Sequence, residues 1–119
     1  MLYTANVSAI KRIKRKVKVY YILRNHGNDV VVPDQLDLDH YKSQALTWEG
    51  FRVNYLARLM RPEADEWMRR VSEEAVPNDV VLADEEADAK YSYRKLLAEM
   101  MVNMFSGRLK LLYAGELTD

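Results

Sequence analysis

The chain contains no cysteine, few glycines and no long apolar run. Without cysteine it has no disulfide, no thiolate nucleophile and no thiolate metal ligand. Its four glycines are scattered along the sequence, at Gly27, Gly50, Gly107 and Gly115. They therefore form neither a phosphate-cradling loop nor a dinucleotide-binding fingerprint.

The sequence also has no stretch that is typical of a membrane span or a targeting signal. No stretch approaches the roughly 20 apolar residues of a membrane span, and the N-terminus has the alternation of a strand instead of a signal peptide. We therefore expect a cytoplasmic protein with no membrane partner. With 49% apolar and 30% charged residues, the chain suits a single domain over residues 1–119, built around one core.

Metal ligands are scarce. His26 and His40 have no histidine one helical turn away, so the sequence predicts no zinc site. Four carboxylates that could bind Mg²⁺ stand close together, at Asp84, Glu85, Glu86 and Asp88. Their spacing matches no defined cage, and consecutive acids in a loop are more often solvated. We predict no metal and no cofactor.

What the sequence does have is charge, in separate blocks. The 18 basic and 18 acidic residues cancel, but six of the basic ones fall between Lys11 and Lys18. Ten of the acidic ones fall between Glu63 and Asp88. We call residues 11–18 the basic segment. A cluster of this kind is a candidate binding surface for a polyanion.

One stretch organises the rest of the chain. Residues 80–83 form an apolar run without alternation, residues 84–90 a polar loop, and residues 91–105 a helix with a wide apolar face. An unbroken apolar strand that leads through a loop into a helix is typical of a parallel sheet. Together with a strand at residues 109–113, it predicts a right-handed βαβ unit, with residues after Gly115 as a tail.

Further strands are expected nearer the N-terminus. The alternation of residues 3–7 and the β-branched residues of 17–23 each predict a strand, and residues 30–32 a short edge strand before Pro33. Residues 8–18 between them are ambiguous. Ser8 can cap a short helix, or the segment can be a basic loop that leads into the strand; we favour a short turn or helix.

Three helices are expected between Pro33 and Pro77. Asp34 is a candidate cap for the first, and Thr47, between Leu46 and Phe51, has the spacing of a hydrophobic staple for the second. Pro62 suits the first turn of the third. The third helix has apolar residues at helical spacing, at Ala64, Trp67, Met68, Val71 and Ala75. The fold class predicted is α/β: a small three-layer α/β/α domain with a mostly parallel sheet of about four strands.

The loop after residue 83 carries a resemblance to a known family. The run 80–86 followed by Ser92-Tyr93-Arg94 resembles the signature region of the domain of unknown function 488 (DUF488) family, which has Cys-x-Glu after its strand and Cys-His-Arg at the next helix. Glu86 and Arg94 match. Asp84 and Ser92 stand at the two cysteine positions, and Tyr93 replaces the histidine.

Other parts of the chain extend the likeness. The opening run 1–7 and several residues further on are similar to short members of that family, at Tyr41-Lys42, Trp48, Phe51-Arg52, Tyr55-Leu56 and Leu59. The resemblance implies an α/β fold but no activity, because the family lacks an established reaction. Loss of both cysteines and the histidine argues against any thiol chemistry in this chain.

The candidate ligand site follows from the order of the elements. If the strands at 3–7 and 80–83 are parallel, the basic segment and the acidic loop share one crevice beyond their carboxyl ends. There the start of the last helix favours an anion. The residues expected to hold a phosphate or other anion are Lys11, Arg12, Lys14, Arg15, Ser92 and Arg94. Charges of this kind are more often structural, and in that interpretation Ser92 only caps the helix, Arg94 pairs with Glu86, and the lysines are solvated.

Three function classes follow. The first, which we favour, is a catalytically reduced module that binds an anionic ligand, a nucleotide or nucleic acid. The second is an enzyme with Asp84 or Glu86 as general base and Arg94 as the substrate anchor, since burial can raise a carboxylate pKa. The third is an interaction subunit without a small-molecule site. The sequence predicts neither an oligomeric state nor a particular substrate.

Overall fold

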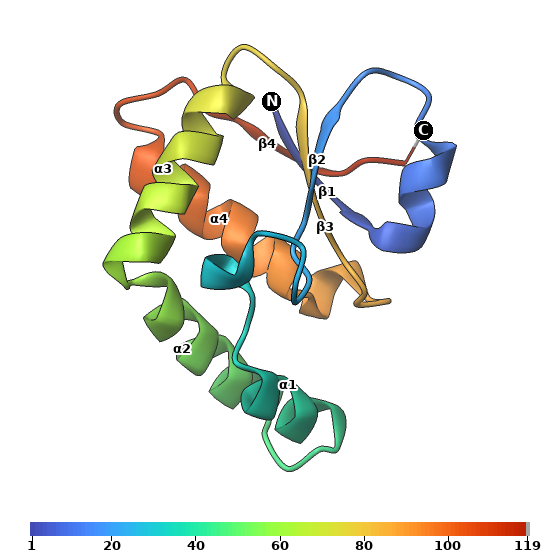
Figure 1. Ribbon diagram of the computed structural model, residues 1–119, viewed down its shortest axis with the longest axis vertical. Helices are drawn as coiled ribbons and strands as arrows, with labels where there is room; N and C mark the ends of the chain where they lie inside the picture. The colour runs from blue at the N-terminus through green and yellow to red at the C-terminus, as the bar shows by residue number, and fades with distance from the viewer. Residues whose placement is uncertain (119) are drawn as a thin grey trace.

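The structure is a computed structural model that describes residues 1–118 (Figure 1). Its described residues form one four-stranded sheet in the order β2-β3-β1-β4, with every pairing parallel. The strands are β1 (Leu2–Asn6), β2 (Lys18–Tyr21), β3 (Val80–Asp84) and β4 (Tyr113–Glu116). The α/β class and the parallel sheet of four strands are confirmed.

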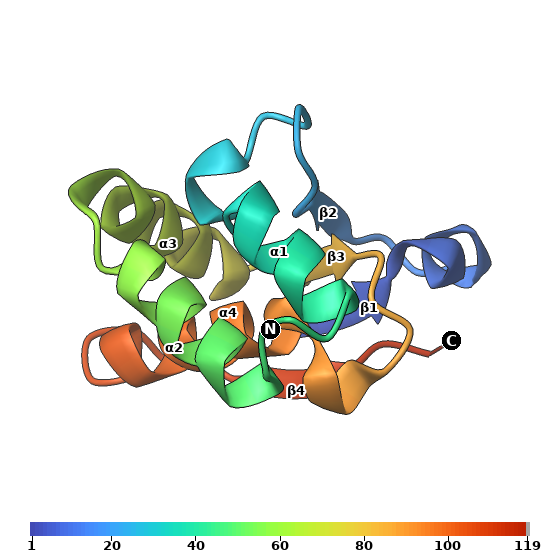
Figure 2. The ribbon, with the colours of Figure 1, turned by 90° about the horizontal axis from the view of Figure 1, so that it is seen from below.

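The helices lie on one face of this sheet. They are α1 (Gln35–Lys42), α2 (Trp48–Leu59), α3 (Pro62–Ala75) and α4 (Tyr93–Phe105). Of these, α4 makes the contact with the strands β1, β3 and β4. Figure 2 shows them gathered on the same side of the strands, with α4 against the centre of the sheet. α4 lies there because it is apolar around much of its circumference, and Leu97, Ala98 and Met101 are fully buried.

The opposite face has a much thinner cover. Ala5 and Val81 point to this side and pack with Leu117. Over them lie Ile10, Ile13 and Val17, which belong to the 3₁₀ helix η1 (Val7–Arg12) and the segment after it. The segment that connects β1 to β2 supplies these three residues. The third layer of the domain is therefore this connecting segment.

The predicted helix starts are confirmed. The Asp34 side chain accepts a hydrogen bond from the backbone N–H of Asp37, and Thr47 accepts one from Gly50. These caps satisfy amides that have no partner within the helix. Pro62 lies in the first turn of α3. The five apolar residues expected on the inner face of α3 are all buried.

Two strand predictions were wrong. Residues 30–32 form no edge strand; the 3₁₀ helix η2 (Asp29–Val31) lies there, and the Val31 carbonyl accepts a hydrogen bond from the buried hydroxyl of Tyr55. The last strand lies later than predicted, because the N–H of Leu109 bonds to the Phe105 carbonyl and closes the end of α4. Residues after Gly115 are therefore not all tail.

The ambiguous segment 8–18 is helical only in its first part. Asn6 caps η1, accepting hydrogen bonds from the N–H and hydroxyl of Ser8 at 2.8 and 2.7 Å. The segment then extends from Ile13 to the start of β2. Among residues 1–118, no helix combines the length and the apolar character needed to cross a membrane.

Candidate functional site

The carboxyl ends of β1 and β3 are where this topology would place a ligand. The two strands are neighbours, with Asn6 opposite Asp84, and their connections leave on opposite faces: η1 follows β1, and α4 follows β3. Such a switch point usually opens a crevice. Here the Asn6 side-chain amide donates to the backbone carbonyl of Glu86 at 2.9 Å, so the protein's own groups bridge the gap.

Arg94 lies inside this region, with a side chain that is 1% exposed. Its guanidinium donates to the carboxylate of Asp84, to the Glu86 carbonyl at 2.7 Å and, through Nε and Nη2, to both oxygens of Glu116 at 3.1 and 2.8 Å. Four of its five N–H groups thus have a partner. Arg94 and Asp84, which are buried, and Glu116, whose side chain is 31% exposed, form what we call the charged triad.

Glu116 ties the edge strand β4 to this triad. Besides Arg94, its carboxylate accepts a hydrogen bond from the Thr4 hydroxyl on β1, and Thr4 also bonds to the Tyr113 hydroxyl at 2.7 Å. A bidentate contact between guanidinium and carboxylate is among the stronger charge-assisted pairs. The triad therefore joins β3, α4 and β4 at one edge of the sheet.

Burial and pairing shift the pKa values of the three groups differently. Burial raises the pKa of Asp84 to about 6, although Arg94 and two backbone N–H groups favour its charged form. Burial also opposes the charge of Glu116, but the hydrogen bonds from Arg94 and Thr4 outweigh it and lower its pKa. Burial lowers the pKa of Arg94, and the carboxylates of Glu116 and Asp84 more than reverse this effect.

At the start of α4, side chains of the protein itself accept hydrogen bonds from backbone N–H groups. The Ser92 hydroxyl donates to the Ala89 carbonyl at 2.8 Å and accepts from the N–H of Lys95 at 3.4 Å. The N–H of Arg94 donates to Asp84 at 2.9 Å. Ser92 is thus a buried helix cap, and the N–H groups of Arg94 and Lys95, in the turn that was expected to hold an anion, already have internal acceptors.

The structure corrects the expected partner of Arg94. It does not pair with the carboxylate of Glu86, which instead lies 3.7 Å from the Lys42 ammonium group. Nor does Arg94 project into an open crevice, because the triad encloses it. Asp84, one of the two candidate bases, has no exposed surface, and Glu86 has 13% of its side chain exposed. A general base must come within hydrogen-bond reach of the substrate proton, which this enclosure prevents for Asp84.

The basic segment does not share the crevice either. Arg15 lies 3.7 Å from Asp79, which immediately precedes β3, and its guanidinium sits 4.8 Å from the centre of the Tyr3 ring. The chain has therefore turned back to the amino ends of the strands before β2 begins. Lys11 and Arg12 are exposed at the end of η1, and Lys14 is exposed on the way to β2. The structure thus separates Ser92 and Arg94 from Arg15.

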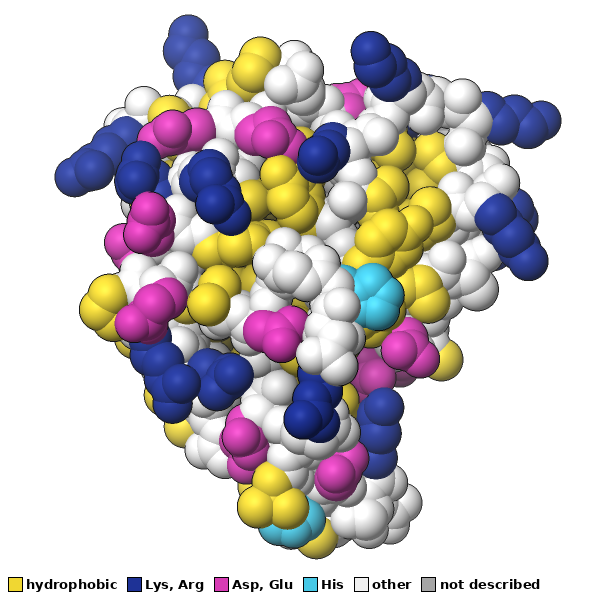
Figure 3. All heavy atoms as spheres, viewed as in Figure 1, with side chains coloured by type: hydrophobic (Ala, Val, Ile, Leu, Met, Phe, Trp, Pro, Cys, Tyr) yellow, Lys and Arg dark blue, Asp and Glu magenta, His cyan; other side chains and the backbone are white. Residues whose placement is uncertain are grey.

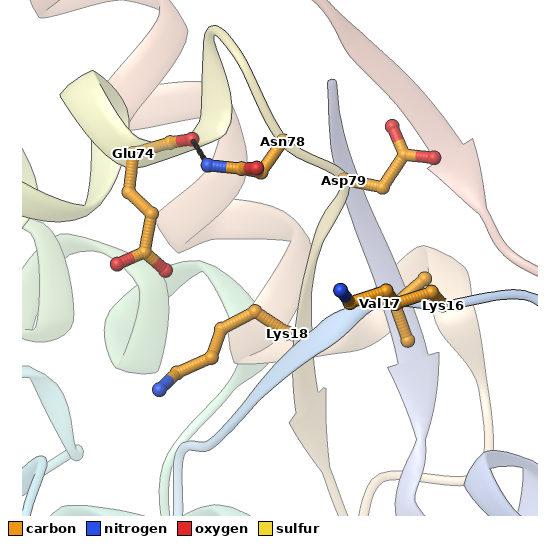
Figure 4. Close-up of a pocket in the computed structure, with 6 residues that line it drawn as sticks. All are labelled: Lys16, Val17, Lys18, Glu74, Asn78 and Asp79. Carbon is orange, nitrogen blue, oxygen red and sulfur yellow. Dashed lines mark hydrogen bonds between the residues drawn. The ribbon is translucent and has the colours of Figure 1, made fainter.

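A hollow lined by charged residues lies at that amino edge. It has a volume of about 410 Å³ and is lined by Lys16, Val17, Lys18, Glu74, Asn78 and Asp79. Figure 4 shows Glu74 and Lys18 on one side of it and Lys16 and Asp79 on the other. The residues come from the end of α3, the loop before β3 and the start of β2. We call this hollow the amino-edge pocket.

Sequence reasoning missed Glu116 and the amino-edge pocket. Glu116 follows a glycine near the end of the chain, so its sequence context resembles a tail. A hydrophobic Leu117 just after it was the available signal of a buried end. Lys16 and Lys18 were part of the basic segment but were not expected to bind a ligand. They lie beside Glu74 and Asp79 only because β2 pairs with β3, which the sequence does not show.

Comparison with known proteins finds no relative of this chain. No family model matches the chain, and no curated protein and no solved structure matches it either. Within the part of the chain that the structure describes, no three histidine or acidic side chains are grouped to hold a metal ion.

Proposed function

We propose that this protein is a non-catalytic binding module for single-stranded nucleic acid, held mainly through the phosphates by the basic segment. The observation that carries the proposal is a row of exposed cations on a firmly anchored stretch of chain. Lys11, Arg12, Lys14 and Lys16 are all exposed, and no carboxylate within residues 1–118 lies in ion-pair contact with them.

The anchoring matters because it lowers the cost of binding. Ile10, Ile13 and Val17 pack onto the second face of the sheet. Lys11, Arg12, Lys14 and Lys16, which alternate with them along the segment, are exposed. Part of the order that a ligand would otherwise have to impose on a free loop is thus already present, although each lysine side chain still loses rotamer freedom. Figure 3, in the same orientation as Figure 1, shows Lys and Arg side chains along the upper and right-hand margins of the molecule, with Asp and Glu side chains among those at the top.

Phosphates would be recognised here by charge and not by a cradle of amides. Each cation that neutralises a phosphate releases counterions, so binding must weaken steeply as salt increases. The net charge of zero does not oppose this, because binding follows the local cluster of cations, and Lys11, Arg12, Lys14 and Lys16 are exposed together on this segment.

The test is fluorescence anisotropy with a labelled single-stranded oligonucleotide at several salt concentrations. We expect binding at low salt, with a log-log slope of about −2 to −3 if three or four phosphates are contacted. The double variant Lys14→Ser/Lys16→Ser should bind more weakly and reduce the slope by about 1.4.

A matched control removes the same charge from another part of the surface. Arg24 and Arg61 are exposed, follow β2 and α2 respectively, and lie outside the basic segment. The variant Arg24→Ser/Arg61→Ser should retain both the affinity and the slope. Absence of binding at low salt, or an equal loss in both double variants, would contradict the proposal.

A further inference from the structure

We infer that the amino-edge pocket receives one nucleotide of the bound strand and selects guanine. This inference rests on the proposed function for its ligand class and concerns a pocket that adjoins the basic segment. A volume of about 410 Å³ lies within the usual range for small-ligand sites, which begins at roughly 300 Å³. Val17 supplies an apolar wall, and the remaining lining residues are polar or charged.

The phosphate end of the nucleotide follows from the position of Lys16. Its side chain lies on the side of the pocket away from Glu74, and it continues the row of exposed cations from Lys14. A strand that runs along the basic segment would bring a phosphate to Lys16 first. The base would then enter toward Glu74 and Lys18.

A hydrogen bond from Tyr20 fixes the carboxylate of Glu74, which is the group that would recognise the base. The Tyr20 hydroxyl donates to both of its carboxylate oxygens, at 3.0 and 3.1 Å, and burial and this contact raise the pKa of Tyr20. The backbone carbonyl of Glu74 accepts the side-chain amide of Asn78 at 3.2 Å. A carboxylate has about four acceptor sites, so the bond from Tyr20 leaves room for further donors.

Guanine is the base that matches this arrangement. Its N1–H and N2–H groups are adjacent donors that a carboxylate accepts in parallel, and its O6 beside them is an acceptor for a lysine ammonium group. Lys18 is on the same side of the pocket as Glu74, and its Nζ lies 5.5 Å from the centre of the Tyr20 ring. Adenine has an amino group where guanine has O6, so it would leave Lys18 without an acceptor. Single-stranded bases expose this edge for such contacts.

The test is a ¹H–¹⁵N NMR titration of the whole chain with GMP, IMP and AMP, which carry the same phosphate. We expect the amides of Lys18 and Asn78 to shift, and GMP to bind at least about tenfold more tightly than AMP. IMP, which lacks the N2 amino group, should fall between them. Glu74→Gln should weaken GMP about tenfold and leave AMP unchanged.

The control is Glu73→Gln, the same change one residue earlier on α3. Glu73 is exposed and pairs with Arg69 at 3.0 Å, outside the pocket lining. Equal affinities for GMP and AMP, or no shift at Lys18 and Asn78, would overturn the guanine pocket, while salt-dependent oligonucleotide binding would leave the proposed function intact. Conversely, GMP selectivity that depends on Glu74 without any oligonucleotide binding would support the pocket and defeat the proposed function.

Discussion

The two edges of the sheet use their charges in opposite ways. At the carboxyl edge the buried Asp84 and Arg94 form one hydrogen-bonded triad with the partly exposed Glu116. At the amino edge Lys14 and Lys16 are exposed on a segment that its apolar residues and Arg15 hold down. The edge at which α/β proteins usually bind ligands is thus closed by the protein itself, and the opposite edge is open.

The difference teaches what each set of charges does. Buried charges stay in a fold only when they are paired, so the triad joins three elements and has little capacity left for a ligand. Exposed cations of one sign repel each other weakly in water and contribute little to stability. They remain free to attract a polyanion. Variants at the two edges should therefore affect different measurements.

The largest effect is expected from Arg94→Met. This variant leaves Asp84 buried without its guanidinium partner and should lower the free energy of unfolding by about 3–5 kcal/mol. The measurement is urea denaturation. Arg94→Met/Asp84→Asn should recover part of the loss, because the two residues are directly coupled. Arg24→Met, at an exposed arginine, is the control and should be close to neutral.

A smaller loss is expected from Glu116→Gln. The change removes the charge that faces Nε and Nη2 of Arg94 and should cost about 2 kcal/mol, since hydrogen bonds to charged groups are worth roughly 1.5–3 kcal/mol. Denaturation and amide hydrogen exchange of β4 would both report it. An unchanged free energy of unfolding would mean that β4 is held by its backbone pairing alone.

The pH dependence of stability should report Asp84. Its pKa rises from an ordinary 3.8 to about 6 in the folded protein, so the folded state binds the proton more tightly than the unfolded chain. This contribution to stability is present at low pH and is lost as pH rises through 6. Between pH 5 and pH 7 the free energy of unfolding should fall by about 1 kcal/mol from this group.

Asp84→Asn removes that titration and serves as the reference for the pH series. Glu116 acts in the opposite direction, because its lowered pKa gives stability that is lost only as pH falls below its ordinary value of 4.5. A wild-type profile parallel to that of Asp84→Asn between pH 5 and pH 7 would contradict the raised pKa.

The smallest change in stability is expected at the amino edge. Lys14→Ser/Lys16→Ser should alter the free energy of unfolding by no more than about 0.5 kcal/mol, because both side chains are exposed. The same variant should lose oligonucleotide affinity. A destabilisation comparable to that of Glu116→Gln would show that the two edges do not differ as described.

Local signals in the sequence were enough for most of the elements. The apolar run before Asp84 gave a central strand, and Asp34, Thr47 and Pro62 marked helix starts correctly, because caps and first-turn prolines act over three or four residues. The edge strand β4 was misplaced. Its pairing partner β1 lies more than a hundred residues away, and a glycine near the end of the chain is typical of a tail. In the structure Gly115 lies within β4 and has a φ of +84°.

Composition and local pattern, by themselves, determined the α/β class, the parallel sheet around β3, the absence of thiol chemistry and the block of exposed cations. These depend on residue type and short-range periodicity. Only the tertiary structure decided which charges meet. Arg94 pairs with Glu116 because β4 lies beside β1, and Lys18 lies near Glu74 because β2 lies beside β3. Charge pairing acts through space, over contacts that the order of residues does not encode locally.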